Sequence, residues 1–224
     1  MDVSSTKPFE GENQAQFAYR ILEEMIVTLE LPPGDRISEQ SLSQRLGIGR
    51  TPVREAMQRL ALEGTIKILP RAGAIISPID IADQFKLIEV RRELERILTG
   101  RAARLADAET CRTFLQLAED FEEAARANSG DLFIKADREF NNLISRSAQN
   151  NYAAYALSPI QAQTRRFWFL HFKRFGDLQK VSQLHASIAR AVASNDEPSA
   201  RAALDRLIDY VEDYTRLTLE SFMQ

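Results

Sequence analysis

The sequence predicts a mainly α-helical protein of two domains, with one small β-hairpin at the end of the first. Apolar residues recur at three- and four-residue steps through most of the chain, which is the spacing of amphipathic helices. Short β-branched runs flank a turn-forming stretch within residues 65–76. The length of 224 residues suits two small domains. We place a disordered tail at residues 1–13, the first domain at 14–78 and an antiparallel helical bundle at 79–224.

Two amphipathic helices open the first domain. Residues 14–29 carry apolar side chains on one face, and the Pro-Pro-Gly sequence at 32–34 is expected to stop this helix. Ser38 is a good N-cap for a second, short helix. Gly47 stands where that helix needs a residue in the left-handed conformation, so we expect the helix to end there.

A third helix and a hairpin complete the first domain. Pro52 suits a first helical position and Thr51 can cap it, so we expect a helix from Pro52 to about residue 62. Its apolar face is predicted to be buried, and its other face carries Arg54, Gln58 and Arg59. The runs 65–68 and 74–76 are predicted to pair as a two-stranded hairpin around the turn at 70–73.

This order of elements is the plan of a winged helix-turn-helix, in which the start of the third helix reads base edges in a major groove. Here those residues are Arg50, Thr51 and Arg54. An arginine fork matches guanine O6 and N7. At the hairpin tip, Arg71 is expected to reach the DNA backbone or minor groove, and Gly73 to permit close approach. The alternative is that these arginines are ordinary surface residues of a three-helix bundle.

The distribution of charge agrees with a DNA-facing surface in the first domain. Residues 43–73 contain six basic and two acidic side chains, a local charge of +4, whereas the whole chain carries −3. The rest of the chain therefore sums to −7. A basic segment on an acidic body suits one phosphate-facing surface and another role elsewhere.

The second domain is predicted to be entirely helical. Turn-forming residues occur near 107, 128–130, 150–151, 176–177 and 195–196. They leave helices of about 15 to 25 residues with short connections, which is typical of an antiparallel bundle.

The N-terminal motif resembles the GntR family of bacterial regulators. It comprises residues 31–39 (LPPGDRISE), 42–56 (LSQRLGIGRTPVREA), 60–64 and 71–73, and the match covers about residues 16–77. The resemblance implies that Arg50, Thr51 and Arg54 contact an operator, helped by Gln40 and by the wing at Arg71 and Gly73. Gly49 departs from the family pattern, which has serine there, and so lacks one phosphate-contacting hydroxyl.

The C-terminal sequence looks like an FCD domain, which marks the FadR-type branch of that family. The resemblance rests on residues 88–95 (IEVRRELE), 101–106 (RAARLA), 137–141 (DREFN) and 184–185 (LH), and covers about residues 81–219. It implies dimerisation and a pocket for a small metabolite, often a carboxylate. In many members the pocket also holds a divalent metal ion.

The chain keeps part of the family's metal-binding set. Asp137 and His185 are present, but Asn141 stands where a histidine is expected four residues after the aspartate, and Leu207 replaces the last histidine. One carboxylate and one imidazole rarely hold a metal without further ligands. We therefore predict no metal site, with Asp137 and His185 as the two candidate ligands that remain. His185 is equally well explained as a core histidine or as an effector contact.

An anionic effector would then need a cationic side chain in place of a metal. Arg91 and the pair Arg165-Arg166 interrupt apolar helix faces, and an arginine fork binds a carboxylate in a bidentate manner. The candidate effector-binding residues are therefore Arg91, Asp137, Asn141, Arg165 and His185. The alternative for each arginine is a surface or inter-helix salt bridge. His171 lies in an aromatic run, and we expect it to contribute to packing or to an interface.

These features predict a cytoplasmic bacterial transcription regulator, more specifically a repressor, that binds a double-stranded inverted-repeat operator as a homodimer and senses a small metabolite, such as an organic acid. The alternative is a constitutive DNA-binding regulator whose C-terminal domain only dimerises. We predict no enzymatic activity, because the sequence shows no nucleophile–base pair and no phosphate loop. The single cysteine excludes an intramolecular disulfide, and no apolar stretch reaches membrane-spanning length.

Overall fold

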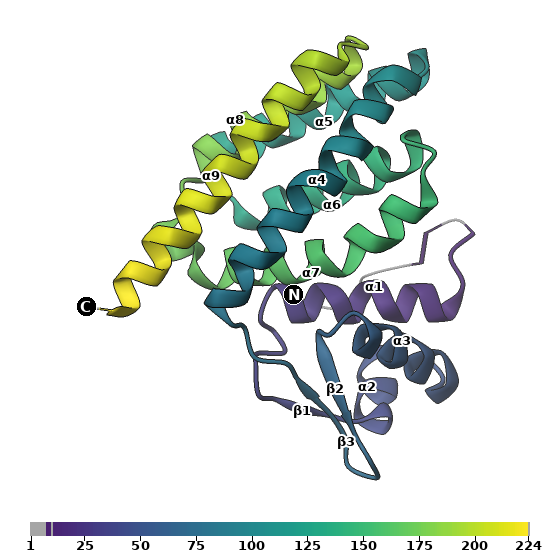
Figure 1. Ribbon diagram of the computed structural model, residues 1–224. Helices are drawn as coiled ribbons and strands as arrows, with labels where there is room; N and C mark the ends of the chain where they lie inside the picture. The colour runs from purple at the N-terminus through teal and green to yellow at the C-terminus, as the bar shows by residue number, and fades with distance from the viewer. Residues whose placement is uncertain (1–7, 10, 224) are drawn as a thin grey trace. The chain divides into compact units, whose positions relative to one another are not determined.

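The computed structural model describes residues 8–9 and 11–223, without the side chains of residues 172–175 and 223 (Figure 1). The described residues form two compact units. The first contains the chain up to Asp80 together with Ser158–Leu170, and the second contains Ile81–Leu157 and the chain from His171 onward. The expected boundary near residue 78 lies close to Asp80. Residues 1–7 and 10 of the predicted tail lie outside the described residues.

Helix α1 (Gln14–Val27) begins the first unit with a capping box. The Asn13 side chain accepts from the backbone N–H of Gln16, and the Gln16 side chain accepts from the backbone N–H of Asn13. The helix ends two residues earlier than predicted, because the chain turns at Leu29, which has a φ of +60°. The sequence Pro-Pro-Gly at 32–34 therefore follows the turn rather than causing it.

Helices α2 (Glu39–Leu46) and α3 (Arg50–Leu62) form the helix-turn-helix. Ser38 caps α2, and Gly47 ends it with φ +64° and ψ +25°, as predicted. The predicted cap of α3 is wrong. Gly49 rather than Thr51 is the N-cap, and Pro52 occupies the third helical position. A proline is tolerated throughout the first turn, because the N–H groups there have no acceptor within the helix.

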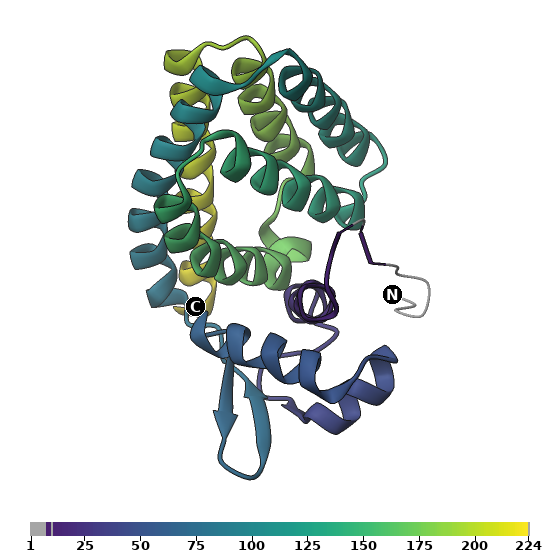
Figure 2. The ribbon, with the colours of Figure 1, turned by 90° about the vertical axis from the view of Figure 1, so that its right-hand side faces the viewer.

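The sheet has one strand more than predicted. Strands β2 (Ile66–Leu69) and β3 (Gly73–Ile76) form the expected hairpin, and β1 (Arg36–Ile37) pairs antiparallel with β3. The strand order among the described residues is β1-β3-β2. Sequence reasoning missed β1 because a two-residue strand has no periodicity of its own. In both views the β2–β3 turn extends beyond α1, α2 and α3 (Figures 1 and 2).

The core of the first unit lies between these helices and the sheet. It is built from buried apolar side chains of α1, α2, α3 and all three strands, including Leu22, Met25, Val53, Leu60 and Ile76. The apolar face predicted for α3 is buried as expected. Fixing α3 on this core leaves its polar face in solvent.

The second unit is helical throughout its described residues. It contains α4 (Ile81–Leu105), α5 (Ala108–Arg126), α6 (Gly130–Ser147), α8 (Leu178–Ala193), α9 (Glu197–Met223) and both ends of α7 (Asn151–Phe175). Helix α8 packs against α4, α5, α6 and α9, and α9 runs alongside α4 (Figure 1). The connections fall at the predicted positions, and Asp107, Ser129 and Asp177 cap the helices that follow them.

Helix α7 contributes to both units, a division that was not predicted. Ser158–Leu170 belongs to the first unit, and the residues of α7 on either side belong to the second. Pro159 lies inside the helix, near the start of the segment that belongs to the first unit. A proline there lacks an N–H donor and crowds the carbonyl four residues earlier, which weakens the helix locally.

Candidate functional site

The start of α3 exposes the side chains that were predicted to read DNA. Arg50 and Arg54 have 61% and 54% of their side-chain surfaces exposed, and Thr51 is also exposed. Within the described part of the chain, no side chain caps the Gly49 end of this helix. The first backbone N–H groups of α3 therefore keep the partial positive charge that favours phosphate.

One carboxylate, that of Glu39, lies beside both arginines. Glu39, the first residue of α2, accepts two hydrogen bonds from Arg54, at 2.8 Å from Nε and 2.8 Å from Nη2. Arg50 Nη2 lies 3.7 Å from the same carboxylate. The bond with Arg54 is the main reason why the pKa of Glu39 is lowered from its usual value. Sequence reasoning missed Glu39, because it lies fifteen residues before Arg54 and in another helix.

The turn of the wing presents Arg71 in an uncommon conformation. Arg71 is exposed and has a φ of +60°, directly after Pro70. The turn is closed by a hydrogen bond of 3.1 Å from the Ala72 N–H to the Leu69 carbonyl. Proline followed by a residue with positive φ is the pattern of a type II turn. That third position favours glycine, so an arginine there carries backbone strain.

Gly73 and Gln40 complete the predicted DNA-binding set. Gly73 has a φ of +81°, and a Cβ atom there would lie 2.3 Å from the backbone oxygen of Ile37. The close approach of β1 therefore explains the glycine without any reference to DNA. Gln40 is exposed on the first turn of α2. The roles of Gln40, Arg50, Thr51, Arg54, Arg71 and Gly73 in binding DNA remain predictions.

In the second unit, the structure brings Asp137, Asn141 and His185 together. The Asn141 amide donates to Asp137 Oδ1 at 3.0 Å, and His185 Nε2 lies 3.3 Å from the same oxygen. Asp137 and His185 are buried. The His185 ring is surrounded by Phe121, Phe133 and Phe140, with centroid distances of 4.8, 5.2 and 5.9 Å. Sequence reasoning missed this aromatic cage.

The hydrogen bond made by His185 Nδ1 determines which nitrogen of the ring carries a hydrogen. His185 Nδ1 lies 2.8 Å from the Val181 carbonyl, so Nδ1 carries the proton and donates it. Nε2 therefore faces the carboxylate of Asp137 with a lone pair, unless a proton or another cation lies between them.

The donor set does not fit the metal that the family resemblance implies. Among the described residues, no group of three or more His, Cys, Asp or Glu side chains could hold a metal ion. Asn141 donates to Asp137, and Leu207 is a buried apolar residue. Two strong ligands inside an aromatic cage fall short of the three or four protein ligands of zinc sites.

The two predicted arginines have carboxylate partners within their own units. Arg91, on α4, forms a largely buried ion pair with Glu95 at 2.9 Å. Arg165 belongs to the first unit, where it pairs with Glu23 of α1. Each arginine thus takes part in a salt bridge. Binding of an effector by Arg91, Asp137, Asn141, Arg165 or His185 stays a prediction.

Two neighbouring residues of α7 also have defined surroundings. Arg166 is buried in the first unit and donates from Nη2 to the Ser77 carbonyl at 2.6 Å, and burial lowers its pKa to about 10. His171 packs edge-on against Phe222 in the second unit, at a centroid distance of 5.6 Å, which agrees with the expected packing role. Burial lowers the pKa of His171.

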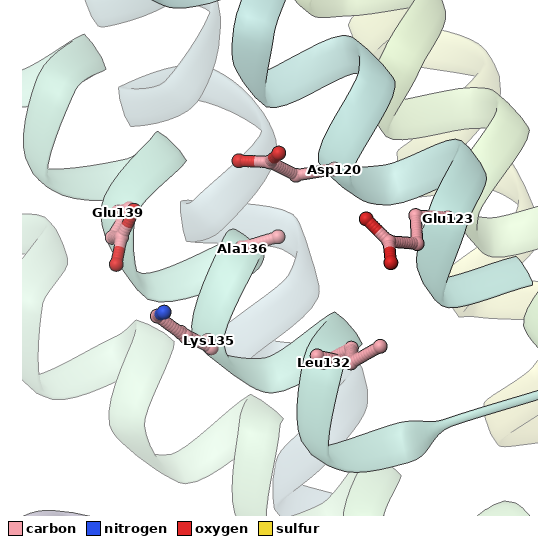
Figure 3. A pocket seen from close by; sticks show the side chains of 6 residues that line it. All are labelled: Asp120, Glu123, Leu132, Lys135, Ala136 and Glu139. Atoms are coloured by element: carbon pink, nitrogen blue, oxygen red, sulfur yellow. The ribbon is translucent and has the colours of Figure 1, made fainter. Parts of the chain in front are cut away.

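A pocket opens between α5 and α6. Figure 3 shows its lining, with Asp120 and Glu123 on α5 and with Leu132, Lys135, Ala136 and Glu139 on α6. Three carboxylates and one ammonium group line it, so its character is acidic. None of the candidate effector-binding residues belongs to this lining.

The fold and the exposed face of α3 define the class of protein: a winged helix-turn-helix DNA-binding domain followed by a helical domain. The chain belongs to the gntR family of bacterial regulatory proteins, whose model matches residues 14–76, and the FCD domain model matches residues 86–210. The predicted family and fold class are therefore confirmed.

Curated relatives carry matching descriptions. The chain is similar to the HTH-type transcriptional repressor RspR of Escherichia coli K12, with 26% identity over 201 residues that cover 90% of this chain and 88% of the relative. It is also similar to the HTH-type transcriptional regulator LutR of Bacillus subtilis 168, with 28% identity over 213 residues, covering 84% and 95%.

The fold is shared with solved structures. The structure of E. coli McbR/YncC superposes with a TM-score of 0.80 and 16% identity, covering 93% of this chain and 99% of that one. Taken together with the two family models, these comparisons make the chain a DNA-binding transcriptional regulator of the GntR family with an FCD domain. No helix among the described residues is long and apolar enough to cross a bilayer.

Proposed function

We propose that this chain is a repressor that binds an inverted-repeat operator as a homodimer and responds to a small metabolite. The observation that carries the proposal is the exposed pair Arg50 and Arg54 at the uncapped start of α3. A helix start with two exposed guanidinium groups can reach base edges and phosphates together. The similarity to RspR, a transcriptional repressor, supports repression as the direction of regulation.

An apolar stripe on α4 supports self-association. Val90 and Ile97 are exposed, at 49% and 41%, and the half-exposed Leu94 lies between them at helical spacing. Side chains three, four and seven residues apart lie on one helix face, so these three form a continuous strip. A second copy related by a two-fold axis would cover the strip and present two α3 helices to an inverted repeat.

The second unit is the proposed sensor. Its polar cluster of buried Asp137 and His185 with partly buried Asn141 lies beside the phenylalanine rings around His185, and polar groups in such surroundings can orient a bound molecule. Helix α7 supports coupling, because its middle belongs to the DNA-binding unit and its ends to the sensing unit. An organic acid that favoured one arrangement of the dimer would change operator affinity.

A selection experiment tests DNA recognition first. The purified full-length protein is incubated with duplexes that have a randomised centre, and bound duplexes are recovered over successive rounds. We expect enrichment of an inverted repeat, and loss of the preferred bases with Arg50→Ala or Arg54→Ala. Recovery of unenriched duplexes by the wild-type protein would refute the proposal.

A second measurement tests sensing. The selected duplex is titrated at fixed salt by fluorescence anisotropy, with and without members of a panel of organic acids, sugars and amino acids. We expect one chemical class to change the affinity at least about fivefold, which is the lower end of allosteric coupling. Thermal stabilisation by the same class should accompany that change.

One observation favours the alternative of a constitutive regulator. Arg91 and Arg165 already pair with Glu95 and Glu23, and Asp137 faces His185. The charges expected to receive an effector are thus balanced within the chain. Tight operator binding that no panel compound alters would support this alternative.

A further inference from the structure

We infer that Glu39 is a specificity-determining residue, which positions the guanidinium group of Arg54 for base readout. The inference rests on the proposed function, because it concerns how the start of α3 discriminates among bases. Its basis is the two-bond contact in which the Glu39 carboxylate accepts from Nε and Nη2 of Arg54, each at 2.8 Å.

The geometry of the contact leaves Arg54 able to bind a base while it is held. A guanidinium group is a rigid plane with five N–H donors, and a carboxylate can occupy one edge of it. Glu39 occupies the edge made by Nε and Nη2, so the edge that includes Nη1 lies outside the pair. A fixed plane presents that second edge in one orientation, whereas an unheld arginine has many rotamers to lose.

Glu39 is itself held in place. It is the first residue of α2, directly after the N-cap Ser38, whose hydroxyl accepts from the backbone N–H of Ser41 at 3.1 Å. Helix α2 packs on α3. A negative side chain in the first turn of a helix is stabilised by the helix dipole. The carboxylate is therefore anchored to the same scaffold that carries Arg54.

The negative charge of Glu39 opposes the attraction between this surface and the phosphates of DNA. Its carboxylate lies beside both arginines that face DNA, and Arg50 Nη2 is 3.7 Å away. A negative charge at this place lowers the affinity for every duplex in the same way, because phosphate attraction is independent of sequence. A role in orientation explains why a carboxylate stands there, since orientation improves only the complexes with the correct base.

These two effects predict opposite changes in a Glu39→Gln variant. Its affinity for unrelated duplexes should rise about two- to tenfold at low salt, because one repulsive charge per subunit is removed. Its preference for the base contacted by Arg54 should fall about tenfold, because the fork is no longer held. A side chain with only a structural role would lower the folded fraction without changing the preferred base.

The test uses selection from the duplex library described above, with the full chain. Wild type, Glu39→Gln, Arg54→Ala and the double variant are compared, and Glu55→Gln serves as the matched control, because Glu55 is an exposed carboxylate on the same helix as Arg54. Tryptophan fluorescence in urea, which reports on Trp168 of the first unit, verifies that each variant is folded.

We expect Glu39→Gln to weaken the preference at the same base pair as Arg54→Ala, and to add no further loss in the double variant. Glu55→Gln should keep the wild-type preference. The inference is overturned if Glu39→Gln retains the full preference, or if it alters a different base pair from Arg54→Ala. If the wild-type protein itself enriches no sequence, the proposed function fails instead, and the two failures are thus distinguished.

Discussion

Replacing Arg71 at the tip of the wing should change fold stability and DNA affinity in opposite directions. Arg71 adopts a φ of +60° after Pro70, a conformation in which an L-residue with a side chain is strained. Strain of this kind persists where the surrounding structure enforces it, and it is frequent at functional sites. An exposed arginine here is therefore best explained by what its charge contacts.

The magnitude follows from two competing terms in Arg71→Gly. Releasing the left-handed strain stabilises the folded state by about 1–2 kcal/mol. The glycine makes the unfolded chain more flexible, which costs about 0.5–1 kcal/mol. The net change is a stabilisation of about 0–1.5 kcal/mol. The loss of one phosphate contact per subunit should lower the salt slope of binding by about 0.9 for each contact, or about 2 for a dimer.

The assay pairs urea unfolding, followed through Trp168, with anisotropy titrations of a selected duplex at several salt concentrations. Arg71→Lys is the matched control, because it keeps both the charge and the strained conformation. It should retain the wild-type stability and most of the salt slope. Destabilisation of Arg71→Gly by more than about 1 kcal/mol, or an unchanged salt slope, would refute the reasoning.

Three further predictions concern other parts of the chain. Gly49→Ser should stabilise the first unit by about a few tenths of a kcal/mol in urea unfolding, because the Gly49 dihedrals, φ −58° and ψ 154°, suit a serine cap. A Cβ atom at this position would lie 3.6 Å from the nearest atom, so it fits without a clash. Gly49→Ala has no hydroxyl to cap the helix and should not stabilise the unit. Burial raises the pKa of Glu63 above its usual 4.5, so its folded form binds a proton more tightly than the unfolded chain. Its contribution to stability is therefore full below pH 4.5 and is lost as the pH rises through the raised value, and a Glu63→Gln variant should not show this loss in thermal melts at several pH values. His185→Phe should cost about 3 kcal/mol in thermal unfolding, because it removes one of the partners of a buried carboxylate, and a second change, Asp137→Leu, should recover most of it; an equal loss in both variants would contradict this.

The parts of the fold that follow local rules were predictable from the sequence. Ser38 and Gly47 bound α2 as expected, because caps depend on a few adjacent residues. The start of α3 was predicted at the wrong residue, since both Gly49 and Thr51 are plausible N-caps. A threonine before a proline looks like a cap, but Gly49 takes that position and Pro52 fits equally well at the third position of the helix.

The contacts that complete the sites were not predictable in this way. Strand β1 exists because Arg36 and Ile37 lie opposite Ile75 and Ala74, which are distant in sequence. Glu39 reaches Arg54 only after α2 has packed on α3. The periodicity of apolar residues and the spacing of motifs describe one helix or strand at a time, so they do not predict contacts between elements.

The balanced charges of the second unit determine what an anionic effector would have to do. Arg91, largely buried, is paired with Glu95, and α4, which carries both, packs against α6 and α8. The hydrogen bond to Glu95 is made from Nε of Arg91 at 2.9 Å, so the edge of the guanidinium group that includes Nη1 lies outside that bond. A carboxylate ligand on that edge would share Arg91 with Glu95, whereas a ligand that displaced Glu95 would separate a buried ion pair, which is strongly unfavourable. In either case the effector changes operator affinity only if it binds one arrangement of α4 more tightly than another, because differential affinity between two states is what allosteric control requires.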